Sequence, residues 1–397
     1  MFPALKVAAV AVTLGLLAGC SSTGAKPAQE LTYNLPPVAV ATTNSLVKLV
    51  SEQRLSPLSA ARSYGYTLAA AREAFVNATD ESARDADAVT AAALTGIEMF
   101  AGNTGAQTEF KALLRRYSSD GATANGKKVA DAWIARAKTD NSAETSGVAD
   151  YPSRDDQWSW VPTGLLRMPF ADPGWSKNKP IVATTASCDI PTPPLDQMQS
   201  QLPSMFEKFD VGSTAEPIVF AFLAGTGTPT PPGQWMQMGV NLVRDQKLDD
   251  AEAMDLLAKL GVVAYDVSIL IWREKAEHAV ARPETMWERT TGETIVLARE
   301  TPNHPSYPSG HSGFSGAGAS IVNEKHANSG LRLELPEDMA APAETWTFKN
   351  ADEARNLISQ SRIISRFHFM ADATAGESLG ACAGQKIIEA FANGDLK

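Results

Sequence analysis

The chain has 397 residues, of which 44% are hydrophobic and 20% charged, values that are typical of a globular protein and exclude a disordered one. Acidic residues outnumber basic residues by 45 to 35. This balance offers no basic footprint for a phosphate backbone, so we expect no nucleic-acid partner.

Residues 1–19 have the pattern of an export signal and are not counted as part of the fold. Lys6 provides a short positive region, and the apolar run over 7–17 that follows is too short to span a membrane. The run ends in Leu-Ala-Gly directly before Cys20, and serines follow.

This segment resembles a lipobox, in which Cys20 is lipidated on sulfur and becomes the mature N-terminus. A plain secretory signal that contains a cysteine is the alternative. The lipobox interpretation implies a protein of the bacterial cell envelope, on the periplasmic side, that contacts the membrane through its lipid anchor. Ser21 follows the cysteine in place of aspartate, which by the same resemblance favours the outer membrane.

Residues 20–43 are small, polar and proline-containing, which predicts a flexible tether. Over 44–145, apolar residues recur every three or four positions in alanine-rich stretches, which predicts helices. Prolines and the tryptophans Trp158, Trp160 and Trp175 crowd the next segment. Because proline at this density excludes long helices, we expect an irregular insertion with linkers over 146–235.

Residues 236–397 are predicted to be helical again. The stretch 251–281 is apolar around most of its surface, so it is expected to be the central helix. Further helices are predicted over 309–324 and 353–391. The expected fold is all-α: a single helical-bundle domain over 44–397 with an irregular Pro/Trp-rich insertion. Cys188 and Cys382 either form a disulfide, which an oxidising compartment permits, or remain two buried thiols.

Three islands of polar residues interrupt these last helices. In the first, Lys275 and Arg282 are seven residues apart, so they are expected to project from one helix face. Pro283 biases Arg282 away from helical geometry, which predicts that the helix ends there. A solvated pair of cations near a helix end is the alternative.

The second island is Pro308-Ser309-Gly310-His311, which predicts a helix start whose free backbone N–H groups can bind an anion. Gly310 allows close approach to the backbone, and the Ser309 hydroxyl adds a donor. His311 has a pKa suited to moving a proton near neutrality. A serine-capped helix start beside a surface histidine is the alternative.

In the third island, Ser361, His368 and Asp372 fall on one stripe of the predicted helix, and Arg362 adds a cation. Asp372 is expected to accept the imidazole Nδ1–H of His368 and to leave Nε2 available as a nucleophile or ligand. An ordinary surface pair is the alternative. Together the islands provide cations, backbone donors and two histidines, which is the inventory for binding a tetrahedral oxyanion.

These three motifs, in this order, resemble those of the superfamily that includes type 2 phosphatidic-acid phosphatases, bacterial acid phosphatases and vanadium-dependent haloperoxidases. Further segments resemble the soluble bacterial haloperoxidase branch: WVPT at 160–163, PPGQW at 231–235, WREK at 272–275, HPSYPSGH at 304–311 and SRII at 361–364. The similarity covers about residues 150–385. No long apolar span follows residue 19, which argues against the integral-membrane lipid phosphatases.

The resemblance implies vanadate as the cofactor, bonded by His368, or phosphate or no cofactor if the chain is a phosphatase. It further implies that His311 exchanges a proton with hydrogen peroxide or with a leaving alcohol, and that Asp372 supports His368. Trp272 and His304 line the pocket, and histidine at 304 is the bromide-type choice. The resemblance also implies a set of donors that hold the oxygen atoms of the vanadate: Lys275, Arg282, Ser309, Gly310 and Arg362.

Arg366 departs from this pattern, because most relatives are expected to have glycine two residues before the histidine. An arginine at that place could crowd the anion, add a contact to it or point away.

Three functions follow in order of preference. The first is a lipid-anchored, vanadate-dependent haloperoxidase-like enzyme that oxidises halide with hydrogen peroxide. The second is an acid phosphatase that cleaves a phosphoester through a phosphohistidine at His368. The first two share one pocket because vanadate mimics the trigonal-bipyramidal transition state of phosphoryl transfer. The third is a non-catalytic envelope lipoprotein that keeps the pocket as a scaffold.

Overall fold

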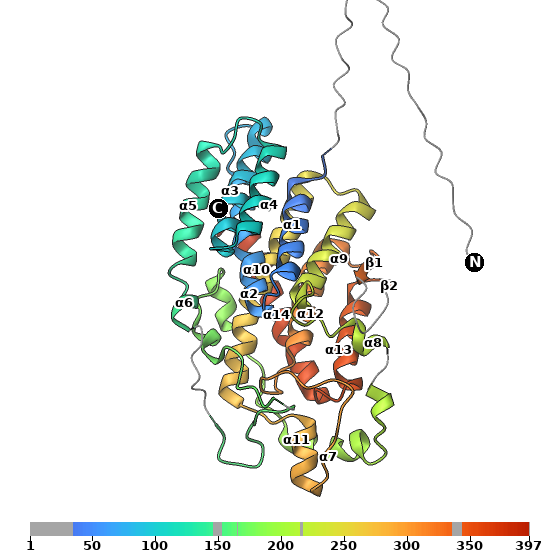
Figure 1. Ribbon diagram of the computed structural model, residues 1–397. Coiled ribbons are helices and arrows are strands. Elements are labelled where there is room, and N and C mark those ends of the chain that lie inside the picture. Colours follow the sequence, from blue (N-terminus) through green and yellow to red (C-terminus); the bar gives the residue numbers. More distant parts are fainter. Residues whose placement is uncertain (1–34, 146–152, 165, 215–216, 336–343, 397) are drawn as a thin grey trace, which may run out of the picture. The chain divides into compact units, whose positions relative to one another are not determined.

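Helices dominate the computed structural model, which describes residues 35–145, 153–164, 166–214, 217–335 and 344–396 (Figure 1). The all-α prediction is confirmed. The predicted export signal, Cys20 and most of the predicted tether lie outside the described residues. The elements and their bounds are α1 (Val38–Glu52), α2 (Pro57–Val76), η1 (Glu81–Ala83), α3 (Arg84–Met99), α4 (Thr104–Tyr117), α5 (Ala124–Ala137), α6 (Ser142–Thr145), η2 (Pro173–Lys177), η3 (Ala183–Ser187), α7 (Leu195–Phe206), η4 (Val211–Thr214), α8 (Pro217–Ala221), α9 (Thr230–Gln246), α10 (Asp250–His278), α11 (Pro283–Thr291), α12 (Gly310–His326), β1 (Leu331–Leu335), β2 (Glu344–Phe348), α13 (Ala351–Ile364) and α14 (Met370–Asn393).

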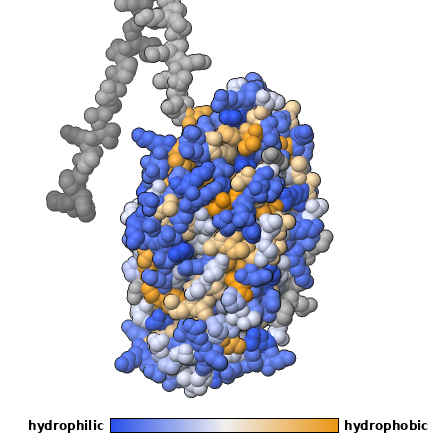
Figure 2. Space-filling model, turned by 180° about the vertical axis from the view of Figure 1, so that it is seen from behind, coloured by the Kyte–Doolittle hydropathy of each residue, from blue (hydrophilic) through white to orange (hydrophobic). Residues whose placement is uncertain are grey.

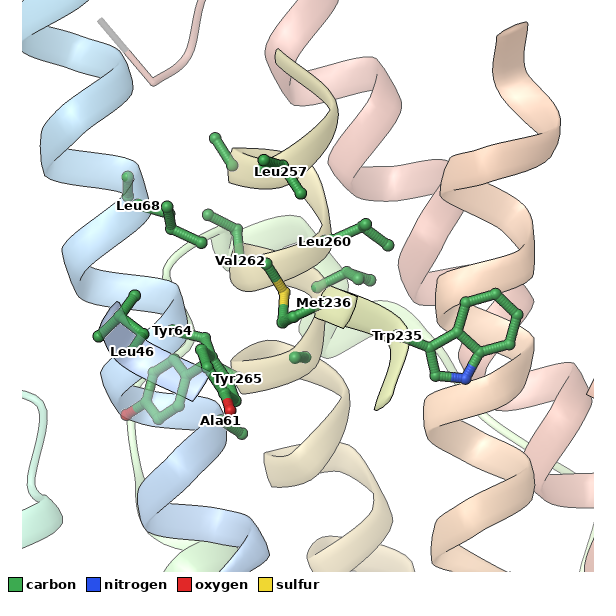
Figure 3. Close-up of a cluster of buried hydrophobic side chains, with 14 of the residues drawn as sticks. Leu46, Ala61, Tyr64, Leu68, Trp235, Met236, Leu257, Leu260, Val262 and Tyr265 are labelled. Atoms are coloured by element: carbon green, nitrogen blue, oxygen red, sulfur yellow. The ribbon is translucent and has the colours of Figure 1, made fainter. Parts of the chain in front are cut away.

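Helix α10 is the central helix of the bundle, as its apolar surface predicts. It contacts α1, α2, α9, α12 and α14, and most of its residues from Leu256 to Trp272 are buried. A capping box formed by Asp249 and Glu252 begins it. Figure 3 shows Leu257 and Leu260 of α10 in one apolar cluster with side chains of α1, α2 and α9. The helix ends at His278, before the predicted residue 281.

Helices α12 and α14 approach each other closely because glycines line their contact. A Cβ atom on Gly380 would lie 2.1 Å from the carbonyl oxygen of Gly313, and one on Gly316 would lie 2.3 Å from that of Glu377. No side chain fits in either place. The main-chain N–H of Ser309 also donates to the carbonyl of Asp372 at 2.9 Å, so the N-terminal ends of the two helices are joined directly.

The prediction of one continuous helix over 353–391 is wrong, because a non-helical connection separates α13 from α14. Arg366 has a φ of 60°, in the left-handed region that no α-helix can continue through. Ser361 and His368 therefore do not share a helical stripe, and His368 lies in the connection between the two helices. The same conformation gives the physical reason why glycine is expected at position 366.

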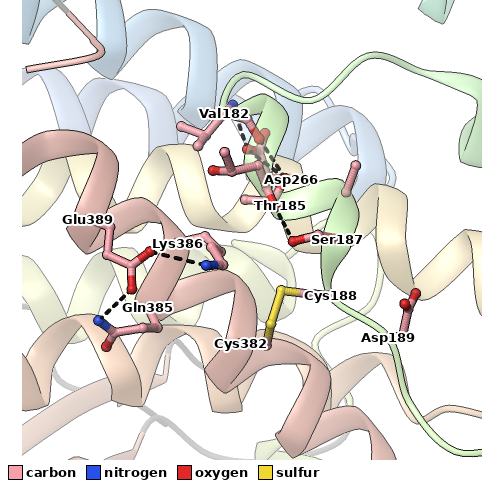
Figure 4. The surroundings of a disulfide bond; sticks show 12 residues. Val182, Thr185, Ser187, Cys188, Asp189, Asp266, Cys382, Gln385, Lys386 and Glu389 are labelled. Carbon is pink, nitrogen blue, oxygen red and sulfur yellow. Dashed lines mark hydrogen bonds and ion pairs between the residues drawn. A yellow bond between two sulfur atoms is a disulfide. The ribbon is translucent and has the colours of Figure 1, made fainter. Parts of the chain in front are cut away.

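The irregular insertion is observed, but it is fixed to the bundle by buried polar contacts. The carboxylate of Asp266 in α10 accepts the N–H groups of Ile181 and Val182 at 2.7 and 2.8 Å (Figure 4). A disulfide between Cys188 and Cys382 joins the insertion to α14, which decides between the two alternatives left open for these cysteines. The insertion also contains α7 and α8, and α9 begins within it.

Two further features differ from the prediction. The expected tether over 20–43 ends earlier, because α1 begins at Val38 and Thr42 and Thr43 are already buried. Strands β1 and β2 form an antiparallel pair, with Leu331 opposite Phe348, where no strand was predicted.

Among the described residues, no helix has the length and apolarity needed to cross a membrane. Figure 2 shows that hydrophilic residues predominate on the face behind that of Figure 1, with scattered apolar patches.

We predict that Gly380→Ala destabilises the protein by about 1–3 kcal/mol, because the added methyl group has no space against α12. Alanine in a helix interior is otherwise favoured over glycine by about 1 kcal/mol, so a loss isolates the packing effect. Urea unfolding of the variant measures the change. Gly225→Ala is the control, because a Cβ there meets nothing within 4 Å. An unchanged or increased stability of Gly380→Ala would show that α12 and α14 can move apart.

Candidate active site

The three polar islands come together where α10 ends and where α12 and α14 begin (Figure 1). Lys275 lies in the last turn of α10, Ser309 is the N-cap of α12, and His368 immediately precedes the N-cap of α14. Almost all of the predicted anion-binding and supporting side chains are at most 1% exposed: Lys275, Arg282, Ser309, Arg362, His368 and Asp372.

Asp372 fixes the orientation of His368. Its Oδ2 accepts three hydrogen bonds, from the Ser306 hydroxyl at 2.6 Å, the Phe369 main-chain N–H at 2.9 Å and the His368 Nδ1–H at 3.0 Å. The pairing of Asp372 with Nδ1 is the one that the sequence predicts. Because a guanidinium group can only donate, the contact of Arg282 Nη1 with Nε2 at 3.0 Å makes Nε2 an acceptor and agrees with this tautomer.

That contact corrects one prediction, since Nε2 of His368 is hydrogen-bonded to Arg282. Arg282 also does not share a helix face with Lys275, because α10 ends at His278 and Arg282 is the extended N-cap of α11. The predicted helix end at Arg282 is also wrong, because α10 ends four residues earlier and Pro283 occupies the first position of the next helix, α11.

Carbonyl groups surround the Arg282 guanidinium. Nε donates to His304 O at 3.0 Å, Nη1 to Phe367 O at 2.8 Å and Nη2 to Pro302 O at 3.2 Å. Nη2 also lies 3.1 Å from Nδ1 of His304. Arg282 therefore connects the loop before α12, which carries His304, with the connection before α14, which carries His368.

Lys275 holds the loop that leads into α12. Its Nζ donates to the carbonyl groups of Pro305, Ser306 and Pro308 at 2.6, 3.2 and 2.5 Å. Burial and the neighbouring Arg282 charge lower the pKa of Lys275 well below its usual value. The ammonium group thus orders the loop by hydrogen bonds while adding positive charge to the site.

The N-terminal end of α12 keeps free donors, as the motif predicts. Ser309 accepts the Ser312 N–H at 3.3 Å and the Ser312 hydroxyl at 3.0 Å, which leaves its own hydroxyl hydrogen to donate. No described residue accepts the main-chain N–H of Gly310 or His311. A Cβ on Gly310 would meet nothing within 4 Å, so an anion can approach this backbone closely.

His311 and His304 are the two other histidines near the cations. His311 Nε2 lies 3.3 Å from the carbonyl of Leu223, which can only accept. Burial and then the Arg362 charge lower the pKa of His311 well below its usual value. The rings of Trp272 and His304 are 5.1 Å apart, and the indole Nε1–H donates to Ala171 O at 2.8 Å.

Arg362 and Arg366 have opposite roles although they lie four residues apart. Arg362 Nη1 donates to Phe222 O at 3.0 Å, and its buried Nε has no partner among the described residues. Arg366 Nε donates instead to Met205 O of α7 at 3.1 Å, and its Nη1 caps α13 at Ile363 O. Of the three possibilities for Arg366, the structure selects the one in which it is held away from the anion site.

The comparisons with known proteins identify the fold. Residues 255–393 match the family model described as the VCPO second helical-bundle domain. A bacterial vanadium-dependent iodoperoxidase structure is 19% identical, with a TM-score of 0.74, over 89% of this chain and 95% of that one. The chain has the vanadium haloperoxidase fold.

Two further structures have the same fold. The apo form of a bacterial vanadium-dependent chloroperoxidase is 12% identical, with a TM-score of 0.63, over 84% of this chain and 95% of that one. A holo form of such a chloroperoxidase is 14% identical, with a TM-score of 0.61, over 92% and 94%. No curated protein matches the sequence.

The charges of the site are suited to an oxyanion. Three buried cations face a single buried carboxylate, Asp372, so the site has excess positive charge. Burial and then Arg282 and Lys275 lower the pKa of His368 well below its usual value. Burial raises the pKa of Asp372 to about 6. The unpaired Nε of Arg362 and the free N–H of Gly310 are the donors that an oxyanion would satisfy.

Sequence reasoning missed Ser306 and the carbonyl groups that hold the cations. Ser306 lies inside the HPSYPSGH segment, so its place in that motif was a usable signal. Its hydroxyl supports Asp372, and its carbonyl accepts from Lys275. Main-chain acceptors such as Phe367 O and Phe222 O leave no signal in the sequence, since every residue has a carbonyl group.

We predict that Arg362→Gln weakens orthovanadate binding about tenfold or more, because a buried charged donor is lost. Arg366→Gln is the matched control on the same helix end, and its dissociation constant should stay within about a factor of two. Equilibrium dialysis with vanadium analysis measures both. Equal losses in the two variants would place Arg366 in the site, and no loss in either would remove Arg362 from it.

Proposed function

We propose that the chain is a vanadate-dependent haloperoxidase that oxidises a halide with hydrogen peroxide. The observation that carries the proposal is the buried cluster of Lys275, Arg282 and Arg362 around a histidine whose Nδ1–H is held by Asp372. This cluster concentrates positive charge where an oxyanion has to be held, and it presents the imidazole with a defined tautomer.

His368 Nε2 would bond the vanadium atom once its contact with Arg282 Nη1 gives way. Arg362 and the N–H of Gly310 would hold oxygen atoms of the anion. Vanadate held by these residues would supply the Lewis acidity that activates hydrogen peroxide toward attack by halide. Asp372 keeps Nδ1 protonated, so Nε2 stays the lone-pair nitrogen throughout.

His311 is suited to accept the peroxide proton. Burial and the Arg362 charge lower its pKa, which favours the neutral imidazole that can accept a proton. An oxyanion bound beside it would add negative charge and raise this pKa toward the working range. Trp272 and His304 form an aromatic edge of the same site, where a polarisable halide could approach.

The test is an activity pair on the full chain purified in detergent. One half is the oxidation of bromide and iodide by hydrogen peroxide, with and without orthovanadate, followed by halogenation of a phenol dye. The other is hydrolysis of a chromogenic phosphate ester, with vanadate as inhibitor. Vanadate-dependent halogenation supports the proposal. Phosphate release that vanadate blocks, without halogenation, would overturn it in favour of the phosphatase, and inactivity in both halves would leave the non-catalytic scaffold.

We predict that His311→Ala lowers the halogenation rate about 100- to 10,000-fold while vanadate still binds, because only proton transfer is lost. His326→Ala is the control, since this histidine lies on the last turn of the same helix. Steady-state kinetics and vanadate dialysis separate the two effects. Loss of vanadate binding in His311→Ala would show that this residue holds the anion instead.

We further propose that the protein is a lipoprotein of the bacterial envelope, anchored through Cys20 on the periplasmic side of the outer membrane. The lipobox-like sequence before Cys20 supports this, and the Cys188–Cys382 disulfide is consistent with an oxidising compartment.

We predict that Cys20→Ser releases the protein from membranes, because the acyl chains have no sulfur to attach to. Fractionation of cells that produce either form, with an antibody against the chain, measures the distribution. Membrane association that persists in Cys20→Ser would remove the lipid anchor.

A further inference from the structure

A second pocket lies beside the anion site, on the outer side of the segments that hold Arg282. Its volume is about 280 Å³, and it is lined by residues 161–164 with Arg167, by α11 and by the loop 294–300. This is near the lower end of the range for small-molecule sites, about 300–1,000 Å³, so it suits a molecule with one ring.

The residues that line the pocket adjoin the segments of the anion site. Glu284 is two residues after Arg282, and Thr301 directly precedes Pro302, whose carbonyl accepts from Arg282. Thr301 Oγ1 donates to Glu284 Oε1 at 2.5 Å and lies 2.6 Å from the Thr163 hydroxyl. The pocket and the anion site are therefore formed by neighbouring atoms of the same segments.

The walls of the pocket are apolar and open to solvent. Val161, Ile295 and Leu297 line it together with Val296, which is 74% exposed. Leu166, next to the lining residue Arg167, is 77% exposed. Among the large apolar side chains of the described residues, these two are the most exposed. Apolar side chains that gather at the edge of a concave site mark a place where a ligand binds.

The charges of the pocket favour a cation. Three carboxylates line it, those of Glu284, Glu288 and Glu300, against two arginines. Both arginines have protein partners: Arg299 stacks on Phe220 at 4.8 Å, and Arg167 donates to Pro162 O at 3.4 Å. Glu284, by contrast, forms no ion pair in the described part of the chain and accepts a hydrogen bond from the Thr301 hydroxyl.

A metal ion does not account for these carboxylates. No group of three or more acidic, histidine or cysteine residues within the described ranges is arranged to hold a metal. The carboxylates are therefore spread around a partly apolar cavity, an arrangement that matches an organic ammonium ion better than a compact inorganic cation.

We propose that this pocket binds a small organic cation with an aromatic or apolar body, through Glu284 and the Val296 wall. We also infer that such a molecule is the acceptor of the oxidised halogen, and this second part rests on the proposed function. Hydrogen peroxide, bromide and a proton give hypobromous acid and water. The bromine of hypobromous acid then replaces a ring hydrogen of the acceptor, so a C–Br bond forms, the C–H bond breaks, and that hydrogen leaves with the hydroxide as water.

The binding test uses tyramine and 4-hydroxyphenylacetate, two phenols of similar size and opposite charge. Calorimetric titrations of the full chain are done without vanadate or peroxide, so they do not depend on the enzyme being active. Tyramine should bind at least tenfold more tightly than 4-hydroxyphenylacetate. Equal binding of the two, or no binding of tyramine, would overturn the proposed cation site.

Two variants assign the binding to this pocket. Glu284→Gln keeps the shape of the side chain and should weaken tyramine binding about tenfold. Val296→Ser changes a mostly exposed side chain, so the fold is preserved, and it should weaken tyramine binding about fivefold by removing apolar contact. Val76→Ser is its matched control, since Val76 is 53% exposed at the end of α2 and outside the pocket. Tyramine binding that is unchanged in both pocket variants would overturn the assignment.

Whether the bound cation accepts the halogen is tested by measuring kcat/KM for bromination of the same two phenols with added vanadate. A higher kcat/KM for tyramine, reduced in Val296→Ser and not in Val76→Ser, supports it. Equal kcat/KM values would overturn the acceptor role while a charge-selective binding site remains. If no bromination occurs with either phenol although tyramine binds selectively, the proposed function fails and the binding site stands.

Discussion

Three buried cations around one buried carboxylate are the constraint on which the rest of this structure depends. Lys275, Arg282 and Arg362 are at most 1% exposed, and Asp372 supplies the only buried carboxylate that the described residues bring to this cluster. Burying a charge without compensation costs several kcal/mol, so each cation needs other partners. Carbonyl groups of the loop before α12 and of the connection before α14 provide them. These two segments therefore follow paths that bring their carbonyl groups to the buried cations.

The positions of the helices make this arrangement possible. Glycines let α12 and α14 meet backbone to backbone, and the Ser309–Asp372 hydrogen bond aligns their N-terminal ends. Both helix starts thus point toward the same volume, where their partial positive charges add to those of the side chains. On the opposite side, Asp266 and the Cys188–Cys382 disulfide hold the irregular insertion against α10 and α14. These bonds tie the segments around the site to one another.

The proposed pocket favours an organic cation and the neighbouring site favours an anion, although both are formed by the segments around Arg282 and Thr301. The guanidinium of Arg282 faces inward to carbonyl groups and His368, whereas Glu284 faces the outer pocket. Arg282 and Glu284, two residues apart in the chain, therefore face a surplus of positive charge and a surplus of negative charge, respectively. An anionic cofactor and a cationic acceptor could then occupy adjacent sites without competing for the same groups.

The sequence by itself determined the all-α class, the central place of α10, the helix start at Gly310 and the residues that form the site, because these depend on local periodicity, capping and motif spacing. The tertiary structure alone decided how the residues are used. Arg366 adopts a left-handed conformation that interrupts the predicted last helix, and its side chain donates a hydrogen bond to Met205 O of α7. The disulfide needed two segments 194 residues apart to meet. The contact of Arg282 with His368 Nε2 likewise depends on two loops folding together, and no local pattern records contacts between distant segments.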